Sequence, residues 1–159
     1  MMRFILCLLF SIGMAHAADL KIGFVDTDRV LRESAPALRA AKRLEKEFDA
    51  RKAELQRVSA QGKSLQAALD KGSIPESERR SRERDLIKLN QDFQRMQREF
   101  NEDLNARRNE ELAGLQERAN QVIRQLAETE KYDAILQDAI YKNPRLDITD
   151  KVIRQLADK

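Results

Sequence analysis

Hydrophobic residues recur at the spacing of long helices through the middle of the chain. From Pro36 to about Asp70 the apolar positions fit a heptad pattern, in which two positions in every seven form a narrow seam. The first seam position holds Ala41, Phe48, Leu55 and Leu69, and the second holds Leu44, Val58 and Leu65. Arg51 and Gly62 interrupt this seam, and either they loosen the helix or they are tolerated there. The pattern predicts a helix over residues 36–70 that packs through one stripe.

A second helical pattern begins after Pro75, where Glu76 and Glu78 suit the first turn of a helix. Its seam starts with Leu86, Leu89, Phe93, Met96 and Phe100. The seam then slips through Leu104 and resumes at Leu112, Leu115, Ala119, Val122 and Leu126. Residues 105–111, NARRNEE, offer almost nothing apolar between the two parts. We expect one long helix that reaches about residue 130.

The short link KGSIP, residues 71–75, folds the two helices back on each other as an antiparallel hairpin. A register that aligns the large residues pairs Leu65 with Leu86, Val58 with Phe93, Leu55 with Met96, and Phe48 with Leu104. At a rise of 1.5 Å per residue, an arm of roughly 35 residues reaches about 50 Å. The sequence therefore predicts a long, thin coiled-coil arm over residues 36–130, with its tip near 71–84.

The two ends of the chain have shorter patterns. Alternating apolar residues predict a strand over 20–26, and a short helix follows it, capped by Thr27 or Asp28 and ending before Pro36. Residues 132–138 and 139–143 predict two further strands, Asn143-Pro144 a turn, and the last residues a helix capped by Asp147 or Thr149.

These elements give a mainly α fold with a small β part. Residues 18–35 and 131–159 form a small α/β body at the foot of the arm. Three short strands and two small helices bury little apolar surface, so we expect several copies to associate through this body.

Residues 1–17, MMRFILCLLFSIGMAHA, have the pattern of a cleaved signal peptide. A basic start at Arg3 precedes an apolar run that is too short to span a bilayer, and Ala15-His16-Ala17 fits a signal-peptidase site. We expect an exported protein that begins at Ala18.

Composition then excludes several kinds of chemistry. Cleavage removes the only cysteine, Cys7, and the only histidine, His16, so disulfides, cysteine nucleophiles, histidine bases and His/Cys metal sites are excluded. The formal net charge falls from +3 to +2 with the loss of Arg3, which is too little to indicate nucleic-acid binding. We expect no cofactor.

Two stretches resemble catalytic motifs without completing them. Gly62-Lys63-Ser64 matches the end of a phosphate-binding loop, but Arg57 stands where that loop needs a glycine, and no strand precedes it. Glu110-Glu111 on a thin hairpin lacks the cleft that acid/base catalysis requires. The sequence supports no enzyme.

The tip of the arm is the first candidate binding site. Residues 71–84 hold five basic side chains against three acidic ones. The candidate contacts with an acidic unfolded chain or an anionic surface are Lys71, Ile74, Arg79, Arg80, Arg82, Arg84 and Lys88. Either these cations attract acidic chains over a distance, or they form an ordinary solvated helix with Glu–Arg pairs.

Three stretches resemble the Skp/OmpH family of periplasmic chaperones. They are KIGFVDTDRVL near the N-terminus, ARRNEEL at 106–112, and YDAILQDAIYKNPRLDITDKVIRQL at 132–156. The resemblance implies a homotrimer with a small body and three helical arms around a central cavity. It also implies an ATP-independent holdase in the periplasm, which binds unfolded outer-membrane β-barrel proteins, prevents their aggregation and delivers them for assembly.

The resemblance further implies a lipopolysaccharide site made from an arginine pair and an upstream lysine. Arg107 and Arg108 match the pair, whereas Gln97 stands at the lysine position with Arg95 and Arg98 nearby. Alternatively, the pair satisfies Glu110 and Glu111 across one helical turn.

Without the resemblance, the residues also allow a different function. A coiled-coil adaptor or structural protein of the cell envelope would use the same hairpin to dock one folded partner.

Overall fold

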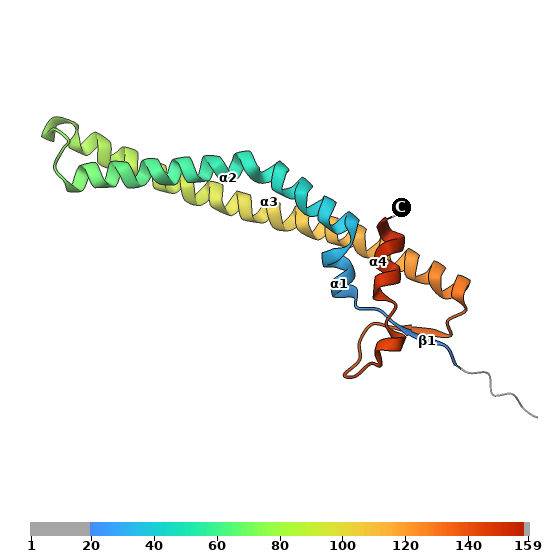
Figure 1. Ribbon diagram of the computed structural model, residues 1–159. Helices are drawn as coiled ribbons and strands as arrows, with labels where there is room; N and C mark the ends of the chain where they lie inside the picture. The colour runs from blue at the N-terminus through green and yellow to red at the C-terminus, as the bar shows by residue number, and fades with distance from the viewer. Residues whose placement is uncertain (1–19, 158–159) are drawn as a thin grey trace, which may run out of the picture.

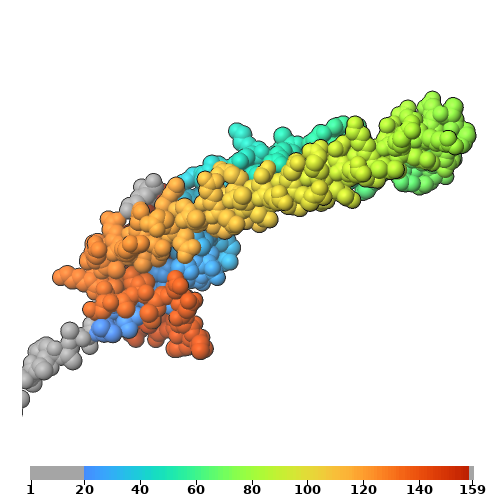
Figure 2. All heavy atoms as spheres, turned by 180° about the vertical axis from the view of Figure 1, so that it is seen from behind, coloured from blue at the N-terminus to red at the C-terminus, as the bar shows by residue number. Residues whose placement is uncertain are grey.

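The long hairpin dominates the fold, as Figure 1 shows for a computed structural model that describes residues 20–157. Helix α2 spans Ala35–Asp70 and helix α3 spans Glu76–Glu130. The two helices lie side by side from the tip to the small body in both Figure 1 and Figure 2. The predicted mainly α fold with a helical hairpin is confirmed. The predicted signal peptide lies outside the described residues.

The tip forms where the sequence predicts it. The backbone of Gly72 has a φ of 65°, in the left-handed region that suits glycine, and its N–H donates to the carbonyl of Leu69. Helix α3 then starts directly after Pro75, with Glu76 and Glu78 in its first turn. The polypeptide reverses within five residues.

The seam between the two helices largely follows the predicted positions. Phe48, Val58, Leu69 and Leu86 are buried. The ring of Phe48 packs edge-on against Phe100, with ring centroids 5.6 Å apart, and Leu104, its predicted partner, lines the same hollow between the helices.

Two predicted seam positions are wrong: Ala41 is exposed, and Leu112 is 42% exposed. Leu112 lies where the heptad frame slips. At this level Arg107 and Glu111 of α3 face α2 instead, because each forms an ion pair with a charged α2 side chain.

The body contains a two-stranded parallel sheet. Strand β1, Ile22–Phe24, pairs with β2, Ala134–Leu136, so that Gly23 lies opposite Ile135. The predicted strand over 139–143 does not form, because the carbonyl of Phe24 instead accepts a hydrogen bond from the Ile148 N–H. A short 3-10 helix, η1 (Pro144–Leu146), follows, with the Asn143 side chain at its cap.

Two short helices complete the body. Helix α1 spans Thr27–Glu33, and its cap is Asp26 instead of the predicted Thr27 or Asp28, since the Asp26 carboxylate accepts the Arg29 N–H at 2.9 Å. Helix α4 spans Thr149–Ala157, and Asp147 accepts the Thr149 N–H at its start.

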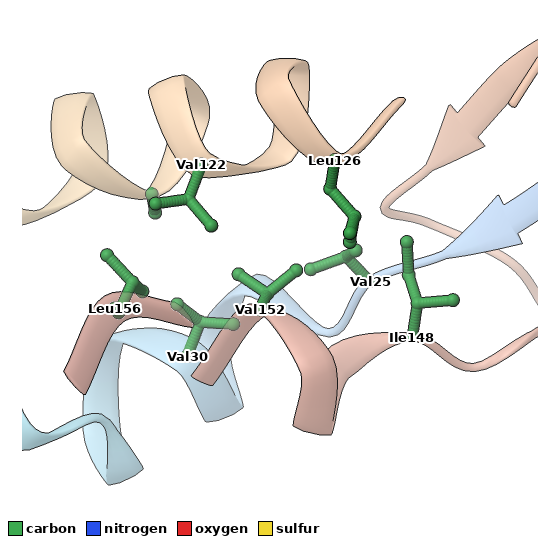
Figure 3. Packing of buried hydrophobic residues seen from close by; sticks show 8 residues of the cluster. Val25, Val30, Val122, Leu126, Ile148, Val152 and Leu156 are labelled. Carbon is green, nitrogen blue, oxygen red and sulfur yellow. The ribbon is translucent and has the colours of Figure 1, made fainter. Parts of the chain in front are cut away.

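The core of the body unites residues that are far apart in the sequence. Figure 3 shows α3 contributing Val122 and Leu126, while α4 contributes Val152 and Leu156. Val30 of α1 is fully buried between them. Helix α3 therefore belongs to both arm and body, and this shared helix ties the arm to the core.

Candidate functional site

The basic side chains at the tip fall into two groups. Arg79 pairs with Glu83, and Arg82 lies within 3.6–3.7 Å of carboxylate oxygens of Glu78 and Asp85. These two arginines match the solvated-helix interpretation, in which neighbouring charges on one helix satisfy each other.

The second group is the basic row, which we define as Arg80, Arg84 and Lys88. All three side chains are exposed, and within the described residues none has an ion pair or a side-chain hydrogen bond. Their four-residue spacing places them on one side of α3, where like charges repel each other. An anionic partner that binds the basic row would therefore relieve the repulsion among its three positive charges.

The other predicted tip contacts differ in exposure. Lys71 caps the C-terminus of α2 and is exposed. Ile74 is half-buried, so it offers less apolar surface than the sequence suggests. Ile87, which the sequence analysis missed, is 58% exposed beside Lys88. Its position off the seam was the available signal, because an apolar residue outside a helix's packing stripe faces solvent.

Charged side chains bridge the two helices farther down the arm. Arg43 donates to Glu111 and Arg51 to Asp103, each at 2.7 Å, and Arg107 donates to Glu47 at 3.1 Å. The hydrogen bond from Arg43 lowers the pKa of Glu111 below its ordinary value. These bridges explain the interruption of the seam at Arg51, whose guanidinium also lies 5.7 Å from the centre of the Phe48 ring.

The incomplete phosphate-loop motif lies inside a regular helix. Gly62, Lys63 and Ser64 are all within α2, so no loop is available to surround a phosphate. Among residues 20–157 there is no cluster of acidic, His or Cys side chains that could hold a metal ion. No helix in the same range has the length and apolar content needed to cross a membrane.

Exposed apolar side chains gather on the body. Leu136 is 48% exposed and Tyr141 82% exposed, while Ile140 between them is fully exposed. They follow or belong to β2, the partner of the short strand β1. Large apolar side chains this exposed, within six residues of one another on so small a body, favour association with another surface.

Comparison with known proteins extends over both arm and body. The model of the family described as outer membrane protein (OmpH-like) matches residues 21–156. The chain belongs to this OmpH-like family.

Named relatives in this family are chaperones. The chaperone protein Skp of Yersinia enterocolitica is 29% identical, covering 92% of this chain and 94% of its own. The protein of the same name from Photorhabdus luminescens is 31% identical, covering 95% and 93%. The OmpH-like chain accordingly belongs with chaperones of outer-membrane proteins and is not an enzyme.

A solved structure supports the same fold. The putative outer membrane chaperone (OmpH-like) from Caulobacter crescentus superimposes with a TM-score of 0.72 at 21% identity, covering 94% of this chain and 91% of that one. The hairpin arm on a small body is thus the fold of a solved OmpH-like protein.

The three residues predicted for a lipopolysaccharide site differ in their ion pairing. Arg107 forms ion pairs with Glu47, Glu110 and Glu111, and its hydrogen bonds to Glu47 and Glu110 raise its pKa. The predicted alternative, pairing with Glu110 and Glu111, is confirmed for Arg107. Arg98 and Arg108 are exposed and have no ion pair within the described residues. Only these two cations are available to a phosphate.

Proposed function

We propose that the protein is an ATP-independent holdase of the periplasm that binds unfolded outer-membrane β-barrel proteins. It prevents their aggregation and delivers them for membrane assembly. The observation that carries this proposal is the family match over residues 21–156, which includes the body and both helices of the arm. The signal-peptide pattern of residues 1–17 supports export to the periplasm.

The working form in this proposal is a homotrimer assembled through the body. The exposed side chains of Leu136, Ile140 and Tyr141 favour association, because burying them removes apolar surface from water. The two-stranded sheet favours it as well, since strands of three residues gain stability from further pairing. Three arms around one body would enclose a client on several sides.

The tips capture clients electrostatically in this mechanism. The basic row and Lys71 are exposed cations at the far end of the long arm, so they meet an approaching acidic segment or anionic membrane surface first. Attraction between exposed charges is screened over about 8 Å at physiological ionic strength. Capture should therefore weaken as salt is added.

Contact with lipopolysaccharide is a separate proposal. Arg98 and Arg108 would bind its phosphates directly, whereas Arg107 would first have to leave its carboxylates. This contact should therefore be weaker than one made by three free cations.

The test is the aggregation of a urea-unfolded outer-membrane β-barrel protein after dilution, followed by light scattering with and without excess mature protein. We expect suppression near one trimer per client, unaffected by ATP and reduced by salt. No suppression by a folded, trimeric sample would refute the holdase proposal. Tight binding of one folded envelope protein, without suppression, would instead support the adaptor.

The role of the tip needs matched variants. Arg80→Gln with Arg84→Gln removes two unpaired cations, whereas Arg79→Gln with Arg82→Gln removes two paired ones from the same turns of α3. We expect the first double variant to slow client association severalfold at low salt and the second to change it little. Equal rates for the two variants would exclude a specific role for the basic row.

A further inference from the structure

The two long faces of the arm have opposite character. All three ion pairs that bridge α2 and α3 lie along one face, which we call the paired face. Its α2 members, Arg43, Glu47 and Arg51, follow one another at four-residue steps and so share one side of the helix. Side chains on this face are committed to holding the two helices together.

Hollows between the helices lie on both faces, but those on the paired face are bordered by the ion-paired Arg43, Arg51 and Arg107. The opposite face, which we call the open face, contains two hollows whose bordering charges form no ion pair within the described residues. The middle hollow has a volume of about 340 Å³ and is lined by Leu44, Phe48, Phe100 and Leu104. The tip hollow has a volume of about 520 Å³ and is lined by Val58, Gly62, Leu86 and Phe93. Gly62 deepens the tip hollow, because it presents no side chain to its neighbours Leu89 and Asn90.

The heptad repeat places both hollows on one side of the arm. Glu45 and Lys52 border the middle hollow, and Ser59 and Gln66 border the tip hollow. These four residues follow one another at intervals of seven, and positions seven apart stay on one face of a coiled-coil helix. A single ligand that runs along the arm can therefore reach both hollows.

Charges around the middle hollow are free to bind a ligand. Glu45, Asp49, Lys52 and Arg108 border it, and within residues 20–157 none of them forms an ion pair or a side-chain hydrogen bond. Both signs of charge are present. This border suits a ligand that places an apolar side chain in the hollow and has polar or charged groups of both signs on either side of it.

The spacing of the hollows favours an extended ligand. Their α2 linings span residues 41–52 and 58–70, so their centres are about 17 residues, or about 26 Å, apart along the helix. Along α3 the linings, residues 100–108 and 86–93, are centred about 22 Å apart, so an extended chain that rises about 3.3 Å per residue covers the distance in about seven or eight residues. Of these two spacings only eight is even, and only an even spacing lets both side chains point the same way from a strand with a period of two.

The surface between the hollows also suits an extended backbone. Gln56 and Gln97 are exposed there, four residues beyond Lys52 and three before Phe100. Their amides can donate and accept hydrogen bonds, as an unpaired strand backbone requires. A helical ligand would satisfy its backbone N–H and C=O groups internally, so the amides of Gln56 and Gln97 would add nothing to its binding.

We propose that the open face binds one extended strand of an unfolded β-barrel client, with two apolar side chains about eight residues apart in the two hollows. A transmembrane β-strand has about 9–11 residues with lipid-facing apolar side chains at every second position, so one strand spans both hollows. The inference rests on the holdase function and assigns the surface that performs it.

Peptides test the spacing directly. Two fluorescent 13-residue peptides of identical composition carry two phenylalanines in a Ser/Thr background, either eight or three positions apart. Binding to the full mature protein is measured by fluorescence anisotropy. We expect the eight-residue spacing to bind at least about fivefold more tightly, because only that peptide reaches both hollows. Equal affinities would overturn the proposal.

Matched substitutions test the location. Ala41→Glu and Ala67→Glu each place a carboxylate at an exposed position that lines one hollow. Ala50→Glu and Ala53→Glu add the same charge at exposed α2 positions that line neither hollow. All four exchange one good helix former for another, so folding should be preserved and is checked by circular dichroism. We expect only the first pair to abolish the preference for the eight-residue spacing.

The light-scattering assay separates this proposal from the function on which it rests. Suppression of aggregation with no spacing preference would leave the holdase intact and overturn the role of the open face. Equal weakening by all four alanine substitutions would do the same. A spacing preference lost only in Ala41→Glu and Ala67→Glu would establish the open face as the binding surface, whatever the aggregation result.

Discussion

Asp147 connects the loop after β2 to the first turn of α4 and should make stability depend on pH. Its carboxylate accepts hydrogen bonds from Lys142 Nζ at 2.7 Å and from the Thr149 N–H at 2.9 Å. Partial burial raises the pKa of Asp147, but the hydrogen bonds from Lys142 and Thr149 outweigh it and bring the pKa from 3.8 to about 2. The ionised form is therefore favoured by the native fold.

The size of the effect follows from this shift. A shift of about two pKa units corresponds to at most about 2.5 kcal/mol. Solvent around the partly exposed pair reduces this to about 1–2 kcal/mol. Because the folded-state pKa is the lower one, this stabilisation is fully present above about pH 4. It is lost as the pH falls from there towards 2.

Asp147→Asn isolates the charge, since asparagine can still accept the Thr149 N–H. We expect the variant to be about 1–2 kcal/mol less stable than the native protein at pH 6, with this difference reduced to about a third at pH 2.5, because the folded-state pKa of about 2 lies just below that pH. The measurement is urea unfolding by circular dichroism at one fixed protein concentration, because association contributes to stability.

Asp138→Asn is the matched control for Asp147→Asn. Asp138 is exposed and, within the described residues, has no ion pair or side-chain hydrogen bond. The control should therefore track the native protein at every pH. A gap between Asp147→Asn and the native protein that stays constant from pH 6 to 2.5 would refute the electrostatic explanation.

Three further substitutions, with Ile87→Ala as a control, probe the core and two of the glycine positions of the arm. Val152→Ala should lower the free energy of unfolding by about 1–3 kcal/mol in urea titrations, because Val152 is fully buried, whereas exposed Ile87→Ala should change it little. Gly62→Ala should raise the melting temperature, with a gain of up to about 1 kcal/mol, because the added methyl meets Asn90 only at ordinary contact distance, 3.6 Å. Gly72→Ala should lower the melting temperature, since its φ of 65° strains any residue with a side chain, and a gain there would contradict the turn geometry.

Some features of the body could not be predicted because they depend on partners distant in the chain. The segment 139–143 has strand-like composition but forms no strand, since Ile148 and not this segment bonds to the Phe24 carbonyl. The parallel pairing of β1 with β2 joins residues more than 100 positions apart. Local patterns carry no information about which distant edge is available.

At the tip of the arm, too, the sequence predicts one part of the site and the fold decides the other. A list of arginines at the tip follows from the sequence, but their division into paired Arg79 and Arg82 and the unpaired basic row depends on side-chain geometry. Arg79 and Arg80 each have Glu76 and Glu83 three or four positions away, so the sequence leaves open which of the two arginines pairs, whereas Arg84 has no acidic residue at either distance. Only the structure shows which pairs form.

The sequence by itself determined the hairpin arm. Heptad spacing requires two seams to face each other, and the Gly72–Pro75 link permits the chain to reverse. Both signals are local, so they can be recognised without knowing the rest of the fold. The tertiary structure alone decided that the arm has a paired face and an open face. That difference depends on how the two helices are rotated about their axes, which sets whether a charge beside a hollow meets a partner on the other helix, as Arg43 meets Glu111, or stays unpaired, as Lys52 does.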